Sequence, residues 1–289
     1  MAKVWLVTGS GSGLGRDVVE AALAAGNRVV ATARRPEQLQ DLVRHYGDKV
    51  RAIRQDVTNS EEAEAAVTTA KEAFGRLDVV VNNAGYSQFG PFEQISAEDF
   101  KAIVDTCFYG VVYTTRAALP VMRKQRSGVI FQVSSVGGRV TRPGNSPYHA
   151  AKWAVSGFAE ALSQETATFG VQVCAIEPGG IRTNWGKRAN SGVPKLLAEY
   201  EESVGKTLSS LDGYWGHENS DSRLMAELIV MLADKNDLPP HLLLGSDALT
   251  VSKQTEDART ALAEKWRETS KSVDFRPVTS ESGNRNPGK

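Results

Sequence analysis

The stretch TGSGSGLG, residues 8–15, decides the fold, because it joins an apolar run at 3–8 to a helical pattern at 14–25. Its spacing does not satisfy G-x-G-x-x-G, but it fits T-G-x-x-x-G-x-G through Thr8, Gly9, Gly13 and Gly15. Glycines let such a turn approach a phosphate closely, and the following helix N-terminus favours the negative charge. The turn therefore predicts a dinucleotide site. Two alternatives stay open: a glycine turn that binds nothing, and one that binds a different nucleotide.

Short β-branched runs alternate with helical stretches through the first two thirds of the chain. This alternation predicts an α/β fold with a parallel, doubly wound sheet and helices on both faces. We expect strands at 3–8, 28–33, 50–56, 79–82, 129–133 and 171–176, a possible short strand at 242–244, and helices at 14–25, 60–74 and 148–169.

The domain organisation follows from the absence of an internal repeat or a clear break in composition. We expect a single domain over residues 1–275, with an insertion at about 184–222 that lacks strand periodicity and carries Trp185, Tyr214 and Trp215. Residues 276–289 are polar and rich in Pro, Gly and Ser, which predicts a mobile tail.

Composition excludes several function classes for this chain of 289 residues. Lys plus Arg and Asp plus Glu number 34 each, so no basic excess favours nucleic acid or an anionic membrane. The sequence shows neither a long apolar run nor a signal-peptide pattern, and no metal site is expected. Two cysteines, Cys107 and Cys174, allow at most one disulfide, which favours a reducing compartment. We expect a cytoplasmic protein.

The end of the second predicted strand bears on which dinucleotide the chain binds. A carboxylate there would accept hydrogen bonds from the ribose of NAD. Here Arg34 and Arg35 follow the strand, and the first acid is Glu37. Guanidinium groups suit a 2′-phosphate, so the sequence favours NADP over NAD, unless the two arginines are ordinary surface charges.

Tyr148 and Lys152 stand four residues apart and share one face of a predicted helix. A nearby cation stabilises phenolate, so we expect Lys152 to lower the pKa of Tyr148 and let it exchange protons with an alcohol or carbonyl. Ser135 follows the fifth predicted strand and could hydrogen-bond a substrate oxygen held by Tyr148. The spacing alone is weak evidence, because such pairs also arise by chance.

Taken together, the chain resembles a compact short-chain dehydrogenase/reductase. The resemblance is carried by TGSGSGLG (8–15), Asp56-Val57, NNAG (82–85), Ser135, YHAAK (148–152) and PGGIRT (178–183), in the family's order and spacing. LLLGSDAL (242–249) also resembles a branch related to hydroxysteroid and retinol dehydrogenases. The resemblance implies a Rossmann-type, seven-stranded parallel sheet with a dinucleotide at its carboxyl edge and a homo-oligomeric assembly.

The resemblance also implies roles for individual residues. Tyr148 would be the acid/base, Lys152 would bind the nicotinamide ribose, and Ser135 would orient the carbonyl. Arg34 would hold the 2′-phosphate, and the segment 184–222 would be a substrate lid. The other implied cofactor contacts are Gly9, Ser10, Gly13, Leu14 and Gly15 at the pyrophosphate, Asp56 and Val57 at the adenine, Asn83, Ala84 and Gly85 at the ribose, and Pro178, Gly179, Ile181 and Thr183 at the nicotinamide.

One position departs from the family pattern. Cys107, in DTCFYG (105–110), replaces an asparagine that usually holds a water linking Lys152 to solvent. A thiol is a weak donor and acceptor and cannot copy a carboxamide. Another group, such as a backbone carbonyl or His149, would have to hold the water, or proton transfer would limit the rate.

These features predict an NADP-dependent oxidoreductase that interconverts an alcohol and a ketone or aldehyde. If the aromatic residues of the insertion face the site, they favour an apolar substrate. If they only pack the lid, they give no information about the substrate. The alternative is a dinucleotide-binding regulator or redox sensor with little catalysis on the same fold. Nucleotide-sugar epimerisation is disfavoured by the short C-terminal region.

Overall fold

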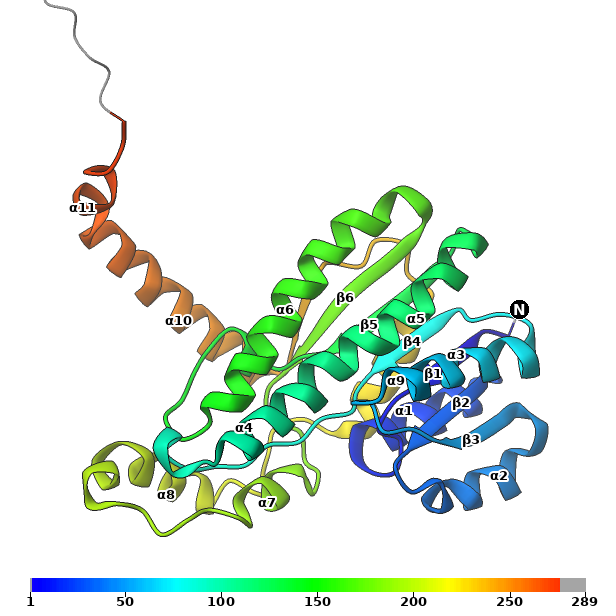
Figure 1. Ribbon diagram of the computed structural model, residues 1–289, viewed down its shortest axis with the longest axis horizontal. Helices are drawn as coiled ribbons and strands as arrows, with labels where there is room; N and C mark the ends of the chain where they lie inside the picture. The colour runs from blue at the N-terminus through cyan, green and yellow to red at the C-terminus, as the bar shows by residue number, and fades with distance from the viewer. Residues whose placement is uncertain (1, 276–289) are drawn as a thin grey trace, which may run out of the picture. The chain divides into compact units, whose positions relative to one another are not determined.

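A parallel sheet of seven strands forms the centre of the molecule, in a computed structural model that describes residues 2–275 (Figure 1). Its strand order is β3-β2-β1-β4-β5-β6-β7, and every pairing is parallel. This confirms the predicted fold class and the short seventh strand. The strands are β1 (Val4–Val7), β2 (Arg28–Ala33), β3 (Val50–Arg54), β4 (Val79–Asn82), β5 (Gly128–Val133), β6 (Val171–Pro178) and β7 (His241–Leu244).

The strands are apolar because both faces of the sheet are covered. All four residues of β1 are buried, and alternate side chains enter different cores. Trp5 and Val7 belong to one core, whereas Val4 and Leu6 belong to the other. A continuous apolar run therefore marks a central parallel strand, since neither face meets water.

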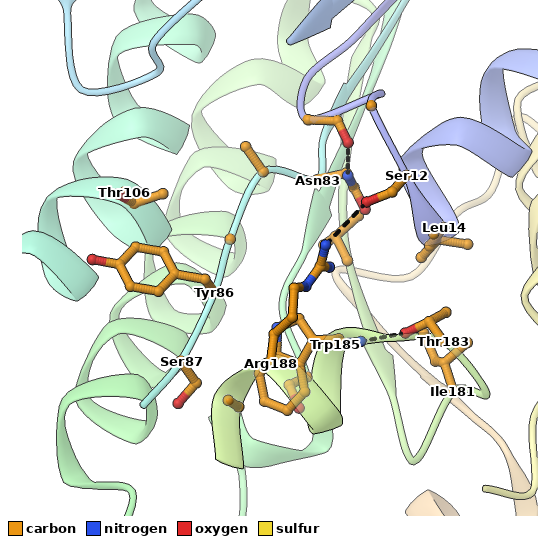
Figure 2. Close-up of a pocket in the computed structure, with 18 of the residues that line it drawn as sticks. Ser12, Leu14, Asn83, Tyr86, Ser87, Thr106, Ile181, Thr183, Trp185 and Arg188 are labelled. Atoms are coloured by element: carbon orange, nitrogen blue, oxygen red, sulfur yellow. Dashed lines mark hydrogen bonds between the residues drawn. The ribbon is translucent and has the colours of Figure 1, made fainter. Parts of the chain in front are cut away.

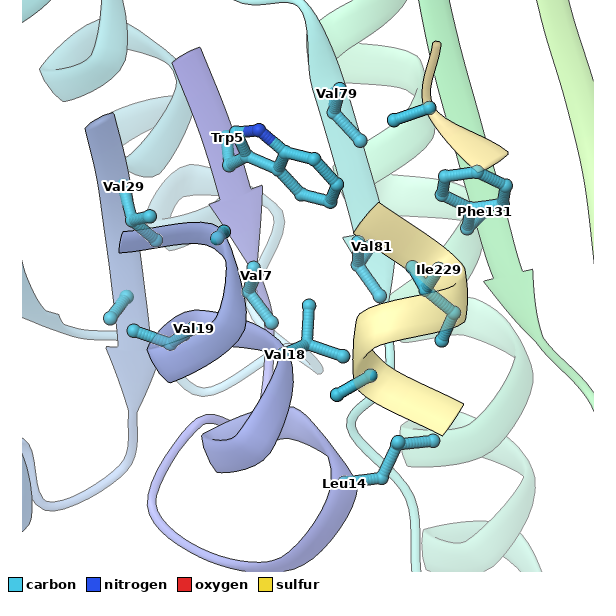
Figure 3. Packing of buried hydrophobic residues seen from close by; sticks show 14 of the residues in the cluster. Trp5, Val7, Leu14, Val18, Val19, Val29, Val79, Val81, Phe131 and Ile229 are labelled. Carbon is cyan, nitrogen blue, oxygen red and sulfur yellow. The ribbon is translucent and has the colours of Figure 1, made fainter. Parts of the chain in front are cut away.

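Two helix layers cover these two cores. α1 (Gly13–Ala24), α2 (Gln40–Tyr46) and α9 (Ser222–Leu232) pack on the first core, where Val18 and Ile229 meet the strands (Figure 3). α3 (Ser60–Phe74), α5 (Gly110–Gln125) and α6 (Ser146–Thr166) cover the second. The sheet is doubly wound.

Some helix boundaries differ from the sequence prediction. α6 begins at Ser146, two residues before the predicted start, and Pro147 occupies its first turn, where a missing N–H is tolerated. α4 (Ala97–Val104) runs into α5 through a π-helical turn, Asp105–Tyr109. This turn contains Cys107, and such turns occur often at functional sites.

The predicted insertion at 184–222 consists of short helices and loops that carry their own small core. It contains α7 (Trp185–Asn190), a π-helical turn (Glu201–Gly205) and α8 (Lys206–Asp212). Its buried residues Ala189 and Leu211 pack with Phe89 from the body. We call residues 184–222 the lid.

The chain divides into two compact units, residues 1–252 and 253–289. α10 (Ser246–Lys265) begins in the first unit and continues into the second, which also contains α11 (Arg267–Lys271). No helix within residues 2–275 is both long and apolar enough to cross a membrane. The tail predicted at 276–289 lies outside the described residues.

Candidate active site

The carboxyl ends of the strands open into a cavity of about 840 Å³. It lies where the strand order reverses between β1 and β4, the place where doubly wound sheets bind nucleotides. Its lining brings together most residues expected from the sequence, namely Gly9, Gly13, Leu14, Arg34, Asp56, Val57, Asn83, Ala84, Gly85, Ser135, Tyr148, Lys152, Pro178, Gly179, Ile181 and Thr183.

Gly9 needs to be glycine for two reasons. Its φ of +68° lies in the left-handed region, and a Cβ at this position would stand 2.8 Å from Ala84 Cα. The turn is tied to the end of β4, because the Thr8 hydroxyl accepts hydrogen bonds from the backbone N–H groups of Asn83 at 3.0 Å and Ala84 at 3.1 Å. The two loops therefore form one rigid edge of the cavity.

Ser10 and Gly15 were expected to contact the cofactor, but they do not line the cavity. The Ser10 side chain is fully buried, and its hydroxyl donates to the Val7 carbonyl at 2.8 Å. A Cβ on Gly15 would lie 2.3 Å from Asn83 Nδ2, so this glycine permits close packing of α1 against the β4 loop. Both residues therefore stabilise the glycine turn through contacts on the side away from the cavity.

Arg34 and Arg35 lie exposed at the rim of the cavity, just beyond β2. Asp56 lines the same end, and its carboxylate accepts hydrogen bonds from the Thr58 hydroxyl at 2.8 Å and the Thr58 N–H at 3.0 Å. Partial burial opposes ionisation of Asp56, but the Thr58 hydrogen bonds and the nearby Arg34 charge leave its pKa below the usual value. This end of the cavity therefore contains two arginine side chains and a carboxylate that Thr58 holds in place.

Ser135, Tyr148 and Lys152 meet on the opposite wall. Lys152 Nζ lies 5.5 Å from the centroid of the Tyr148 ring and donates to the Val133 carbonyl at 2.7 Å. The Ser135 hydroxyl accepts the Gly137 N–H at 3.0 Å, which places it at the end of β5. Burial of the Lys152 ammonium lowers its pKa.

The predicted lowering of the Tyr148 pKa by Lys152 is wrong for the protein without a cofactor. Burial raises the pKa of Tyr148, with a smaller upward effect from Cys107, and the hydrogen bond with Ser135 only partly offsets them. The Lys152 ammonium points to the Val133 carbonyl, and desolvation of the phenol dominates. Tyr148 is therefore protonated at neutral pH, as a proton donor must be.

Cys107 is fully buried behind the wall that carries Tyr148 and Lys152. Its thiol donates to the Tyr86 carbonyl at 3.3 Å, and burial raises its pKa. His149 is turned away from Cys107, because its Nδ1 lies 2.9 Å from the Gly137 carbonyl and its Nε2 accepts the backbone N–H of Arg142. His149 is thus unable to replace the asparagine of the family pattern.

Aromatic side chains of the lid face the cavity. Trp185 and Trp215 both line it, and the Trp185 ring lies 5.1 Å from the Tyr148 ring. Trp215 also packs 6.1 Å from Phe89, so it serves the lid core as well. Tyr214 packs behind this wall and does not line the cavity. Some lid aromatics therefore face the cavity, and some pack the lid itself.

Several lining residues were not expected from the sequence. Arg188 reaches from α7 across the cavity mouth, and its Nη1 donates to the Ser12 hydroxyl at 3.3 Å (Figure 2). Isolated polar residues carry no sequence signal, because only the fold brings them to one place. The others include Gln38, Gln55, Thr58, Tyr86, Ser87, Asp105, Thr106 and Glu218.

A buried ionic network lies next to the site, around Glu177 of β6. This carboxylate is fully buried and pairs with Arg139 and with His241 Nδ1, the latter at 2.8 Å. It also accepts a hydrogen bond from Ser156 at 3.0 Å, and the Ser156 hydroxyl lies 2.9 Å from that of Ser134. The network holds α6, which carries Tyr148, against β6 and β7.

The cavity fits a dinucleotide in shape and chemistry. A glycine turn that a Cβ would obstruct leads to the N-terminus of α1, whose free N–H groups can bind phosphate. Arg34 and Arg35 add positive charge at the rim. Ser135, Tyr148 and Lys152 lie on the other side of the same space, where a substrate carbonyl could meet the nicotinamide end.

Comparisons with known proteins agree with this geometry. A family model described as short chain dehydrogenase matches residues 3–194. The chain is 44% identical over 271 residues to oxidoreductase BOA17 of Botryotinia fuckeliana, covering 93% of this chain and 98% of that protein. A short-chain dehydrogenase from Streptomyces avermitilis is 38% identical with a TM-score of 0.87, covering 95% of this chain and all of that one.

Two solved structures with bound dinucleotides are also similar. A short-chain dehydrogenase/reductase from Burkholderia phymatum, in complex with NAD, is 25% identical with a TM-score of 0.77 and covers 90% of this chain and 95% of its own. ElxO with NADP bound is 27% identical with a TM-score of 0.72 and covers 86% of this chain and all of its own. These neighbours support a nicotinamide dinucleotide and leave the choice between its two forms open.

Proposed function

The chain belongs to the short-chain dehydrogenase family, and within it we propose an NADP(H)-dependent oxidoreductase that interconverts an alcohol and a ketone or aldehyde. The observation that carries this proposal is the meeting of Ser135, Tyr148 and Lys152 on one wall of the cavity that the glycine turn borders. A hydride carrier and a proton carrier are the two parts that carbonyl reduction requires.

The cofactor, when bound, supplies or accepts the hydride. Tyr148, which is protonated at neutral pH, donates the proton to the substrate oxygen in the direction of reduction. Ser135 shares the substrate oxygen with Tyr148 and orients it. Lys152, which donates to the Val133 carbonyl, would bind the nicotinamide ribose.

Arg34 and Arg35 are the basis for proposing NADP rather than NAD. Both side chains line the rim at the end of β2, where the adenine ribose of a dinucleotide lies in this fold. A charge-assisted hydrogen bond to phosphate contributes about 1.5–3 kcal/mol. We therefore expect a preference for NADP(H) of about tenfold or more.

We further propose an apolar carbonyl or alcohol substrate, because Trp185 lies beside Tyr148 and Trp215 also lines the cavity. Homo-oligomer formation is proposed from the family alone. The free, buried cysteines Cys107 and Cys174 support a cytoplasmic location, where thiols stay reduced.

A panel of ketones and aldehydes, assayed with NADPH and with NADH, tests the proposal through nicotinamide absorbance. We expect turnover of apolar carbonyls with kcat/KM at least about tenfold higher for NADPH. Equal or better efficiency with NADH would refute the argument from Arg34. Dinucleotide binding without turnover of any substrate would instead favour a regulator or redox sensor, the function that the replacement at Cys107 would allow.

A further inference from the structure

Arg188 occupies an unusual electrostatic position. It belongs to α7 of the lid, yet its guanidinium lies at the opposite side of the cavity mouth, on the Ser12 hydroxyl (Figure 2). Within residues 2–275 it forms no ion pair with a carboxylate. The contact with Ser12 is therefore a cation held by a neutral group.

Ser12 is the residue that precedes α1, and the N-terminus of α1 is itself positive. The Ser12 side chain does not cap the helix, and the first turn of α1 contains no acidic residue. A helix N-terminus carries roughly half a positive charge on its free N–H groups, so it repels the Arg188 guanidinium. An anion between the two would convert this repulsion into attraction on both sides.

We propose that Arg188 is a phosphate-binding residue that contacts the pyrophosphate of the bound dinucleotide from the lid side. The inference rests on the proposed function, which supplies the ligand class. The glycine turn from Gly9 to Gly13 is the pyrophosphate end of the cavity, whereas Arg34 and Arg35 stand at the end of β2. Arg188 and Arg34 therefore serve different phosphates of the same molecule.

The assignment gives the lid a second role. Trp185 and Arg188 lie on the same short helix, one against Tyr148 and the other against the glycine turn. The backbone N–H of Trp185 also donates to the Thr183 hydroxyl at 3.2 Å, and a Cβ on Gly13 would lie 3.7 Å from the Thr183 side chain. Phosphate binding by Arg188 would thus hold in place the helix that walls the substrate site.

Direct binding to the full chain tests the assignment without turnover. Arg188→Ala is compared with Lys187→Ala, which removes the same charge from the preceding residue of α7. Lys187 is exposed and does not line the cavity. The Kd of NADPH, from its fluorescence or by calorimetry, should rise about tenfold or more for Arg188→Ala and less than about twofold for Lys187→Ala. Arg188→Lys should be intermediate, since lysine keeps the charge and loses the planar pair of donors.

Adenosine 2′-monophosphate separates the two phosphates, because it has the 2′-phosphate and lacks the pyrophosphate. Measured by competition with NADPH, its affinity should be unchanged in Arg188→Ala and reduced in Arg34→Ala, whereas NADPH affinity should fall in both. The assignment would be overturned if Arg188→Ala lost affinity for NADPH and for adenosine 2′-monophosphate equally. It would also be overturned if Arg188→Ala and Lys187→Ala bound NADPH with the same Kd. Failure of the wild-type chain to bind NADPH would overturn the proposed function instead.

Discussion

The glycine turn and the lid border the same cavity, but different forces shape them. The turn is fixed by its backbone, because Gly9 adopts a left-handed φ and touches Ala84. The lid is fixed by large side chains, since Trp215 packs against Gly186 and Phe89. Backbone demands leave a glycine pattern in the sequence, whereas side-chain packing between distant segments leaves none. We therefore expect substitutions in the body to affect chemistry and cofactor binding. Substitutions in the packed core of the lid, unlike those at Arg188, should affect the substrate.

The largest effect should come from the body wall, at Tyr148. Tyr148→Phe removes the proton donor and keeps the ring against Trp185, so kcat should fall about 10²–10⁴-fold. The Kd of the cofactor should stay within about twofold of wild type, since the ring is retained. Tyr113→Phe, outside the cavity, is the control. A variant at Tyr148 that keeps most of its kcat would exclude this residue as the acid.

Gly9→Ala should have the next largest effect. The new Cβ would meet the Ala84 backbone at 2.8 Å in a left-handed conformation that alone costs about 1–2 kcal/mol. We expect a lower melting temperature and at least about tenfold weaker dinucleotide binding, because the turn must move. Gly157→Ala, which meets nothing within 4 Å in α6, should leave binding unchanged. Wild-type cofactor affinity in Gly9→Ala would mean that the turn is not rigid.

Gly186→Ala tests the lid side of the comparison. Its Cβ would lie 2.1 Å from Trp215 Cε3, so the indole must shift, at a cost of about 1–3 kcal/mol confined to the lid core. We expect KM for an apolar substrate to rise several-fold and tryptophan fluorescence to change, with the main melting transition nearly unmoved. Gly192→Ala, also in the lid but in open space, should change none of these. If Gly186→Ala lowered the melting temperature as much as Gly9→Ala, the proposed difference between the lid and the glycine turn would be refuted.

Cys107→Asn should have a small effect in the favourable direction. The replacement restores a carboxamide behind Lys152, where a thiol now donates to the Tyr86 carbonyl. If proton supply to Tyr148 limits turnover, kcat near neutral pH should rise a few-fold with less change in KM, and a solvent deuterium isotope effect should shrink. Cys174→Ala, buried in the core that contains Trp5 and Val7, is the control. An unchanged or lower kcat would show that the relay is satisfied elsewhere.

The sequence predicted the sheet and most of the cavity lining, because apolar strands and strand-to-helix glycines are local signals. It failed where the answer depends on distant contacts. Ser10 and Gly15 belong to the glycine pattern, but the fold turns them away from the cavity. The pKa of Tyr148 depends on its burial, which spacing to Lys152 does not reveal. Arg188 reaches Ser12 only because the lid crosses the cavity mouth.

The ionic network around Glu177 makes the packing of α6 against β6 and β7 depend on pH. Hydrogen bonding to Glu177 raises the pKa of His241 above its usual 6.5, whereas burial of Glu177 is outweighed by His241 and Arg139, which lower its pKa below 4.5. The His241 contribution is complete below pH 6.5 and is lost as pH rises through its raised pKa. The Glu177 contribution is complete above pH 4.5 and is lost as pH falls through its lowered pKa.

Both contributions are therefore complete together only in mildly acidic solution. Calorimetric melting temperatures should be highest near pH 5–6 and fall toward pH 8, and His241→Gln should flatten that alkaline slope. A slope that is unchanged in His241→Gln would exclude His241 as its source. Ser156 joins Glu177 to Ser134, which bonds the Lys152 carbonyl at 3.1 Å. Protonation of His241 therefore also strengthens the contacts that hold α6 in place. The position of the helix that carries Tyr148 would thus be held most firmly in mildly acidic solution.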